Sequence, residues 1–150
     1  MRTDSDATHW IVCVEWVDVE RPMFLLDDIA AWDAASGVLE ASVRWTPESW
    51  AVAGHFPAGP IVPGSVLLEV MAQTGSLAVH LARPHERTVL VGADRLRIKR
   101  PVIPPISLTV RARLERLSAR GATVYGEVTE GDAQVASTTI LFATYRLPER

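Results

Sequence analysis

The stretch GHFPAGPIVPGSVLLEVMAQ, residues 54–73, decides how the chain is organised. Its prolines at 57, 60 and 63 exclude a continuous helix and remove backbone donors from any strand, so residues 52–64 are expected to form an ordered loop. Helix-forming residues then run from Ser65 to Ala82, and Pro84 stands where a helix has already ended. The sequence therefore predicts a stiff loop that leads into one long apolar helix.

Strand patterns lie on both sides of this segment. Before it, residues 10–19 are rich in β-branched and aromatic side chains, and residues 22–33 and 37–46 are two further extended segments joined by a turn near Ser36 and Gly37. After it, residues 88–97 are extended, and apolar and polar residues alternate from 106 to 115 as in a strand covered on one face.

A hairpin closes the pattern. Residues 124–129 and 133–146 are separated by the turn Glu130-Gly131-Asp132, which predicts two antiparallel strands. Four consecutive strands after a single apolar helix favour an α+β fold, with the helix packed against an antiparallel sheet. A chain of 150 residues without repeats or a low-complexity linker fits one domain, residues 1–150.

Composition and charge limit the kinds of partner. With 48% hydrophobic and 22% charged residues the chain has the make-up of a soluble folded protein, and a net charge of −3 provides no general attraction to nucleic acid or membranes. The charge is uneven, because residues 1–50 carry a net −7 and residues 95–120 a net +7. The basic segment either steers an acidic partner or is a solvated face whose arginines pair with the acidic half.

The sequence also indicates a compartment. The single cysteine, Cys13, excludes an intrachain disulfide and is expected to be a small buried apolar side chain. Residues 1–10 lack the basic-then-apolar order of a signal peptide, and the apolar stretch 65–82 contains Glu69, Gln73 and His80, which argues against a membrane span. We therefore expect a cytoplasmic protein.

The polar residues of the predicted helix fall on one side. Ser65, Glu69, Gln73, Ser76 and His80 lie within about 80° of one another around the helix axis. A solvent-facing stripe normally carries several charges, but Glu69 is the one Asp, Glu, Lys or Arg between 65 and 82, so we expect the helix to be buried nearly all round. A lone buried carboxylate is costly, and such groups concentrate at functional sites.

The proline loop delivers a histidine to the start of the same helix. His55 is followed by Phe56-Pro57 and then by Pro63-Gly64, whereas His9, His80 and His85 have no such context and are expected to be structural. Gly64 has no side chain to obstruct a ligand, and free N–H groups at a helix N-terminus bind developing negative charge. A base, an acid and an oxyanion site suit proton abstraction next to a carbonyl with loss of a leaving group.

The residues His55-Phe56-Pro57, Pro60, Pro63-Gly64, Glu69 and Met71-Ala72-Gln73 resemble the active-site segment of the (3R)-hydroxyacyl-ACP dehydratases of type II fatty-acid synthesis. The likeness continues in Gly92, in Asp94 and in residues 97–102, and more weakly in residues 21–27, so it covers most of the chain after residue 20. The resemblance implies the hot-dog fold, an antiparallel sheet wrapped around one long helix, in a homodimer or a trimer of dimers.

The resemblance also implies roles for individual residues. His55 would remove the C2 proton of a 3-hydroxyacyl thioester, and Glu69 from the partner chain would protonate or hold the departing 3-hydroxyl. Burial in an apolar tunnel favours the protonated form of such a carboxyl group. The N–H of Gly64 would bind the thioester oxygen, Gln73 would orient Glu69, and Phe56 and Pro57 would support the loop. Glutamate rather than aspartate at 69 implies dehydration without isomerisation, and no metal or cofactor is implied.

The family's substrates arrive on an acyl carrier protein, and the basic residues Arg95, Arg97, Lys99 and Arg100 would dock this acidic partner. Three departures from the family pattern are Glu20-Arg21-Pro22-Met23, where histidine-arginine-aromatic-proline is usual, and Ala58 and Pro105, where glycines are usual. They leave acyl chain length and the pathway, fatty-acid or polyketide-type, undecided.

Two alternatives to a dehydratase remain at this point. One is a hot-dog acyl thioesterase, and the other is a non-catalytic subunit that binds an acyl carrier or serves as a scaffold. The tryptophans also allow two interpretations, since each either fills the core or lines a tunnel: Trp10, Trp16, Trp32, Trp45 and Trp50.

Overall fold

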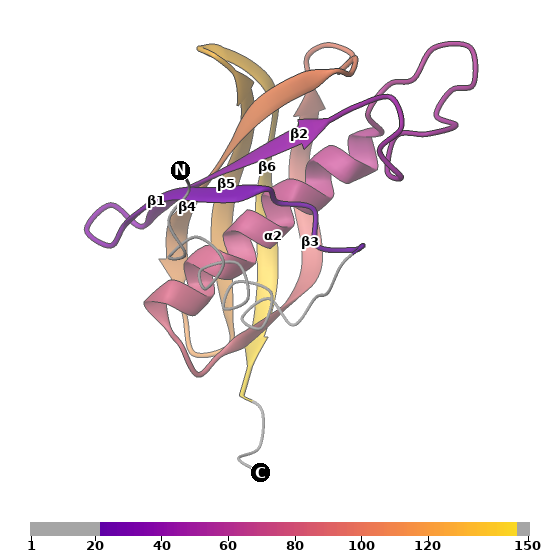
Figure 1. Cartoon of the computed structure of the whole chain (residues 1–150). Coiled ribbons are helices and arrows are strands. Elements are labelled where there is room, and N and C mark those ends of the chain that lie inside the picture. The colour runs from indigo at the N-terminus through magenta and orange to yellow at the C-terminus, as the bar shows by residue number, and fades with distance from the viewer. Residues whose placement is uncertain (1–21, 147–150) are drawn as a thin grey trace.

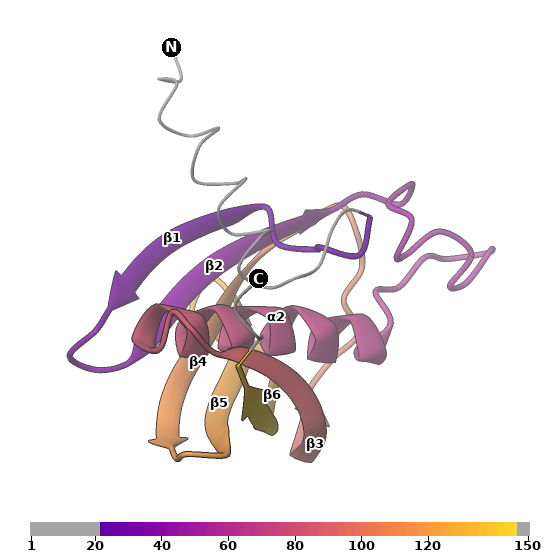
Figure 2. The same cartoon turned by 90° about the horizontal axis from the view of Figure 1, so that it is seen from below.

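The computed structural model describes residues 22–146. Its elements, in chain order, are β1 (Asp28–Asp33), β2 (Val38–Trp45), α2 (Gly64–Ala82), β3 (Arg87–Ile98), β4 (Ile106–Leu117), β5 (Gly121–Glu130) and β6 (Ala133–Tyr145). The strands form one antiparallel sheet in the order β1-β2-β4-β5-β6-β3, and the sheet curves around α2 (Figures 1 and 2). The predicted α+β fold, with a sheet wrapped around one helix, is confirmed.

Most predicted elements agree with the structure to within a few residues. The helix begins at Gly64, one residue earlier than predicted, and the four predicted strands after it correspond to β3–β6. Residues 22–33 were expected to be extended throughout, but the ladder begins only at Asp28. The preceding Phe24, Leu25 and Leu26 are buried in the core, so packing rather than strand pairing holds that part of the segment. The predicted strand at residues 10–19, with Cys13, lies outside the described residues.

Alternation along the strands separates the two faces of the sheet. On β4, Leu108, Val110 and Ala112 are buried, whereas Arg111 and Arg113 between them are exposed. A side chain at Gly126 on β5 would meet Met71 of α2, with a Cβ only 3.0 Å from the Met71 Cβ. The face that carries the buried residues is therefore the face against α2, and the arginines lie on the outer face.

The hairpin between β5 and β6 has the predicted turn. Glu130 pairs with Ala133, which leaves Gly131 and Asp132 as a two-residue connection. Gly131 has a φ of 55°, a left-handed conformation that glycine adopts at little cost. The glycine in the sequence was therefore a reliable sign of where the chain reverses.

Burial of α2 differs between its two ends. From Val70 to His80 every residue except Ser76 is buried, but Ser65 is exposed and Val66, Leu68 and Glu69 are half-buried. The prediction that the helix is buried nearly all round is correct for the later turns and wrong for the first two, where Leu67 is the residue that points into the core. The helix is long and apolar enough to cross a membrane, but 61% of its apolar window is buried inside the protein, so packing against the sheet accounts for its apolar character.

Candidate active site

His55 is held by a loop that folds back on itself. Its backbone N–H donates to the carbonyl of Val52 at 2.9 Å, and its own carbonyl accepts from the N–H of Ile61 at 2.7 Å. The ring atom Nδ1 lies 3.0 Å from the carbonyl oxygen of Ile61. Because a carbonyl oxygen can only accept, Nδ1 carries the proton in this contact and Nε2 keeps its lone pair. The loop therefore presents Nε2 of His55 as a base.

Two neighbours define the position of this histidine. Gly54 has a φ of 86°, so the sharp bend just before His55 requires a residue without a Cβ. The ring of Phe56 stacks on the imidazole, with centroids 4.3 Å apart and an interplanar angle of 26°. Phe56 and Gly59 exchange backbone hydrogen bonds of 3.2 and 3.1 Å around Pro57, and Phe56 stays 57% exposed. These contacts are suited to the predicted supporting role of Phe56 and Pro57, which stays a prediction.

The helix start offers uncompensated backbone donors. Pro63 is the N-cap and makes no side-chain capping bond, and the first turn contains no acidic residue. As the first helical residues, Gly64 and Ser65 have N–H groups without an acceptor inside the helix, at the positive end of the helix dipole. A Cβ on Gly64 would lie 2.4 Å from Cδ1 of Ile98, so glycine also allows the end of β3 to approach. This terminus can hold a partial negative charge.

Glu69 lies in the second turn and is oriented by Gln73. Its Oε1 accepts a hydrogen bond of 2.8 Å from Nε2 of Gln73, one turn further on. The same Nε2 donates to the carbonyl of Met23 at 2.8 Å, and Oε1 of Gln73 accepts from the N–H of Leu25 at 2.9 Å. Gln73 is only 2% exposed, so its side chain is fixed at both polar atoms. The side chain of Glu69 makes no other hydrogen bond or ion pair within residues 22–146, which leaves Oε2 available to a substrate.

The backbone anchors of Gln73 were missed by sequence reasoning. Met23 and Leu25 contribute a carbonyl and an N–H to the site from a segment 50 and 48 residues away in sequence. Backbone groups are the same in every residue, so no residue type marks them. The apolar residues beside them, Phe24 and Leu26, were the available sign that the segment is pinned to the core.

Within residues 22–146, the structure shows no hydrogen bond or ring contact between His55 and Glu69. Neither side chain lines the cavity beside Arg83 and Glu86, the cavity beside Trp45 and Trp50, or the cavity beside Arg97 and Arg113. Their meeting across a subunit boundary therefore stays a prediction. Within the same residues, no group of three or more His, Cys, Asp or Glu could hold a metal ion.

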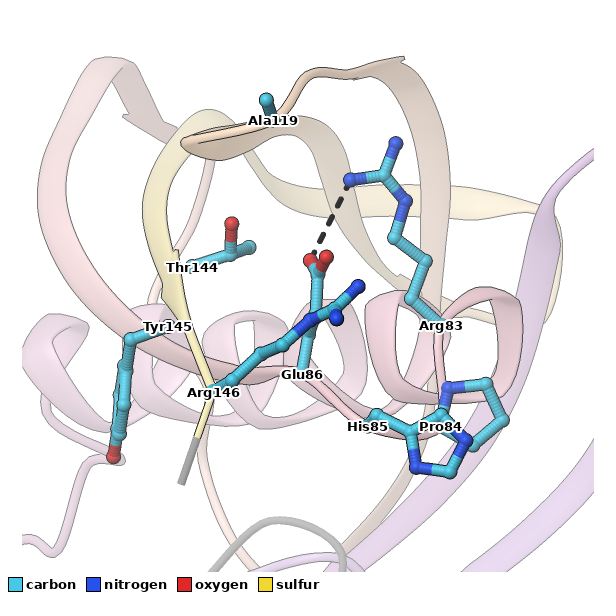
Figure 3. A pocket seen from close by; sticks show the side chains of 8 residues that line it. All are labelled: Arg83, Pro84, His85, Glu86, Ala119, Thr144, Tyr145 and Arg146. Carbon is cyan, nitrogen blue, oxygen red and sulfur yellow. Dashed lines mark hydrogen bonds and ion pairs between the residues drawn. The ribbon is translucent and has the colours of Figure 1, made fainter. Parts of the chain in front are cut away.

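One cavity of about 580 Å³ lies at the opposite end of α2 (Figure 3). Arg83, His85 and Glu86 line one side, and Thr144 and Arg146 at the end of β6 line the other. Nη1 of Arg83 donates to the carbonyl of Ser118 at 2.7 Å and lies 3.5 Å from Oε2 of Glu86. Because this cavity follows the last turn of α2, it is separate from Gly64 and Glu69 in the first two turns.

The tryptophans divide between core and cavity. Trp45 is 4% exposed and belongs to the core, and Trp32 is half-buried against it. Trp50 is 57% exposed and lines, with Trp45 and Arg44, a cavity of about 440 Å³ near the start of the proline loop. Trp10 and Trp16 lie outside the described residues.

The basic segment is partly neutralised. Arg100 forms an ion pair with Glu130, and Arg111 pairs with Glu40 of the acidic half at 2.8 Å. Arg95, Arg97 and Lys99 are exposed and make no ion pair within residues 22–146. Pairing with the acidic half thus explains Arg111, whereas the three exposed side chains are free for another partner.

A curved antiparallel sheet around one helix, with a histidine loop before the helix and a glutamate in its second turn, defines a hot-dog protein with a candidate acid–base site. A family model described as a FabA-like domain matches residues 19–141. The chain belongs to the FabA-like family.

Curated relatives cover nearly the same part of the chain. It is 34% identical over 125 residues to the 3-hydroxyacyl-[acyl-carrier-protein] dehydratase FabZ of Moorella thermoacetica, which covers 81% of this chain and 86% of the relative. It is 32% identical over 139 residues to the FabZ of Klebsiella pneumoniae, which covers 90% of this chain and 91% of the relative. These identities support the predicted resemblance to the hydroxyacyl-ACP dehydratases.

Solved structures support the fold. The dehydratase heterocomplex ApeI:P from Xenorhabdus doucetiae aligns with a TM-score of 0.72 at 16% identity, over 91% of both chains. A thioesterase from Haemophilus influenzae aligns with a TM-score of 0.68 at 19% identity, over 99% of this chain and 96% of the other. Because one scaffold carries both names, the fold does not choose between dehydration and thioester hydrolysis.

Proposed function

We propose that the protein dehydrates a (3R)-hydroxyacyl thioester, carried by an acyl carrier protein, to the trans-2-enoyl thioester in fatty-acid or polyketide-type chain assembly. The observation that carries this proposal is the hydrogen bond between Nδ1 of His55 and the carbonyl of Ile61, because it fixes the tautomer in which Nε2 is a base. Membership of the FabA-like family and the FabZ relatives support the same reaction.

The chemistry needs one proton taken and one given. Nε2 of His55 removes the proton from C2, and the electron pair of that C–H bond forms the double bond to C3. The C3–O bond breaks, and the hydroxyl leaves as water with a proton from the carboxyl group of Glu69. Charge that develops on the thioester oxygen is held by the N–H of Gly64. Gln73 keeps Oε1 of Glu69 engaged, so Oε2 is the oxygen that faces the leaving group.

A homodimer brings these groups together. Strand β3 is at the edge of the sheet and has 12 residues, of which the consecutive Val89, Leu90 and Val91 are 50%, 41% and 63% exposed. A long, apolar, unpaired edge is a pairing site for another strand. We propose that two copies pair through β3, so that His55 of one copy faces Glu69 of the other. Replacing Val91 by lysine is expected to give monomers in sedimentation equilibrium and to abolish activity.

We propose that Lys99, at the end of the basic segment nearest the helix start, docks the acidic carrier protein. Lys99 is exposed and unpaired within residues 22–146, and it directly follows the end of β3, where Ile98 contacts Gly64. An acidic carrier docked there would bring its thioester close to the helix start. Replacing Lys99 by glutamate is expected to raise KM for a carrier-bound substrate, with little change for a short thioester analogue that lacks the carrier.

The activity is tested with 3-hydroxybutyryl carrier protein. Wild-type protein is expected to form the conjugated 2-enoyl product, without the 3-enoyl isomer and without free thiol, and H55A and E69Q are each expected to form it at least about 10²-fold more slowly. Release of free thiol alone would replace the proposal with a thioesterase. Absence of both products, from several acyl chain lengths, would favour a non-catalytic subunit.

Mixing the two inactive variants tests whether the site is shared. If His55 and Glu69 of one site come from different chains, a dimer of H55A with E69Q has one intact site, so a randomised mixture should recover about a quarter of the wild-type activity. If both residues come from the same chain, every site stays defective and no activity returns. The result thus distinguishes an interface site from a site within one protomer, independently of the substrate's chain length.

A further inference from the structure

The outer face of the sheet carries a cavity of about 440 Å³ that the dehydration reaction does not use. Three arginines line it, Arg95 and Arg97 on β3 and Arg113 on β4, together with the hydroxyl side chains Tyr125, Ser137 and Thr139. Its volume is within the range of about 300–1,000 Å³ that is typical of small-molecule sites. We call it the outer arginine cavity.

Strand register explains how the cavity is formed. Arg113 is opposite Tyr125, which is opposite Thr139, and in the next row Ser137 is opposite Arg97. Since neighbouring strands are about 4.8 Å apart, the arginines of β4 and β3 stand roughly 14 Å from each other across β5 and β6. The side chains of Ser137 and Thr139 on β6 are short, so β6 forms the bottom of the cavity between the longer arginine side chains of β3 and β4.

The backbone of β3 is shaped at this place. The register of β3 with β6 shifts between Asp94 and Arg97, and Arg95 within this bulge has a φ of 52°. A non-glycine residue in the left-handed region is uncommon, and bulges of this kind redirect side chains near functional sites. The extra residue of the bulge brings Arg97 opposite Ser137, and both Arg95 and Arg97 line the cavity.

The positive charge of the cavity is only partly balanced. Glu115 is the acidic residue in the lining, and its Oε1 accepts a hydrogen bond of 3.1 Å from Arg113. Two further carboxylates belong to the same rows of the sheet, since Asp94 is opposite Thr139 and Glu127 is opposite Ser137. The guanidinium of Arg113 lies 5.3 Å from the ring centroid of Tyr125, which holds it over the floor. Arg97 donates only to the carbonyl of Leu96, and Arg95 has no side-chain partner within residues 22–146. Two guanidinium groups therefore keep donors for a ligand.

We propose that the outer arginine cavity binds a phosphate group of a small phosphorylated molecule. Guanidinium forks match phosphate oxygens in pairs, and donors that approach from two sides, with hydroxyls below, suit a tetrahedral anion. The cavity lies on the face of the sheet away from α2, so its ligand does not compete for His55 or Glu69. The phosphate is either free inorganic phosphate or the phosphate of a nucleotide such as coenzyme A.

Titration of the full-length protein with inorganic phosphate tests the site, at constant ionic strength and with chloride as the reference anion. Saturable shifts are expected in the backbone amide NMR signals of Ser137 and Thr139. R97Q and R113Q are each expected to weaken binding about tenfold, because each removes a charge-assisted hydrogen bond. R116Q is the matched control, since it removes an exposed arginine of the same strand that does not line the cavity, and a change below about twofold is expected.

Coenzyme A and dephospho-coenzyme A then distinguish the source. Tighter binding of coenzyme A than of the dephospho form, with the difference lost in R97Q, identifies a nucleotide 3′-phosphate as the ligand. Equal binding of the two, with inorganic phosphate still sensitive to R97Q and R113Q, identifies free phosphate. The proposal is overturned if no anion shifts Ser137 and Thr139, or if R116Q weakens binding as much as R113Q. None of these measurements depends on catalysis, so they test the phosphate site independently of the proposed dehydratase activity.

Discussion

The two ends of α2 differ although they belong to one continuous helix. The later turns are enclosed by the sheet, and Gly75 there is so close to Phe142 and Val124 that an added Cβ would lie 3.1 to 3.3 Å from their side chains. The first two turns carry Ser65 and Glu69 on a surface that the sheet leaves half open. One end therefore holds the fold together, and the other end is left available for a ligand or a second subunit.

Gln73 links the buried later turns of α2 to the half-open first turns. It is buried like the later turns, but its hydrogen bonds reach back to Glu69 in the open part and across to Met23 and Leu25. Enclosed side chains with all polar atoms bonded move little, so the closed end can position a side chain in the open end. The comparison predicts that substitutions in the first turns change activity, that substitutions in the later turns change stability, and that Gln73 changes both.

The largest expected effect is on catalysis at the open end. E69Q keeps the shape of the side chain and removes the transferable proton, so kcat should fall by about 10² to 10⁴-fold. The melting temperature should stay within a few degrees of wild type, because Glu69 is only half-buried. Steady-state kinetics and thermal unfolding of the same preparation check both parts. A large loss of stability would show that the open end is structural after all.

Replacing Gln73 by methionine should have the next largest effect. Methionine has a similar volume but makes none of the three hydrogen bonds, and the N–H of Leu25 and the carbonyl of Met23 lose their partner. Buried groups left unpaired cost about 1–3 kcal/mol in unfolding free energy. Urea unfolding should show that loss, and kcat should fall together with it. S76A, which removes one half-buried hydroxyl from the same helix, should leave kcat unchanged.

A matched pair of glycines separates packing from activity. G75V places a branched side chain against Phe142 and Val124, which are both buried, and should lower the unfolding free energy by about 1–3 kcal/mol. G64V meets only the side chain of Ile98, which is 44% exposed and can rotate away. Its stability should change less, while activity falls. If urea unfolding showed that G64V and G75V are equally destabilised, the proposed difference in packing between the open and closed ends of α2 would be wrong.

The smallest expected effect is a pH dependence at the closed end. Burial, followed by the positive charge of Arg87, lowers the pKa of His80 below its usual value. A backbone hydrogen bond at Glu86 opposes this shift, and the charge of His85 adds to it. Below about pH 6.5 the unfolded chain therefore binds a proton that the folded state does not take up, so stability is full above that pH and falls as the pH drops toward the lowered pKa. H80Q should flatten urea-derived stability between about pH 5 and 7. S76A provides the control, since it removes a half-buried hydroxyl from the same helix and no titratable group, and it should keep the wild-type slope.

Local patterns predicted the elements well because each pattern depends on neighbouring residues. Prolines 57, 60 and 63 marked the loop, alternation marked β4, and Gly131 marked the last turn. The candidate residues His55, Gly64 and Glu69 were also found from sequence, because all three belong to one proline loop and the helix that directly follows it. The half-open first turns were not predicted, because the sheet that covers or uncovers them comes from strands far away in the chain.

By itself, the sequence determined a loop rich in proline, a single apolar helix with one carboxylate, and a set of strands that have one apolar face. Tertiary structure alone decided the tautomer of His55, the anchoring of Gln73 by backbone groups of Met23 and Leu25, and the gathering of Arg95, Arg97 and Arg113 around one cavity. Each of these depends on groups brought together by strand pairing and loop closure, and distances between such groups are not encoded in local residue order.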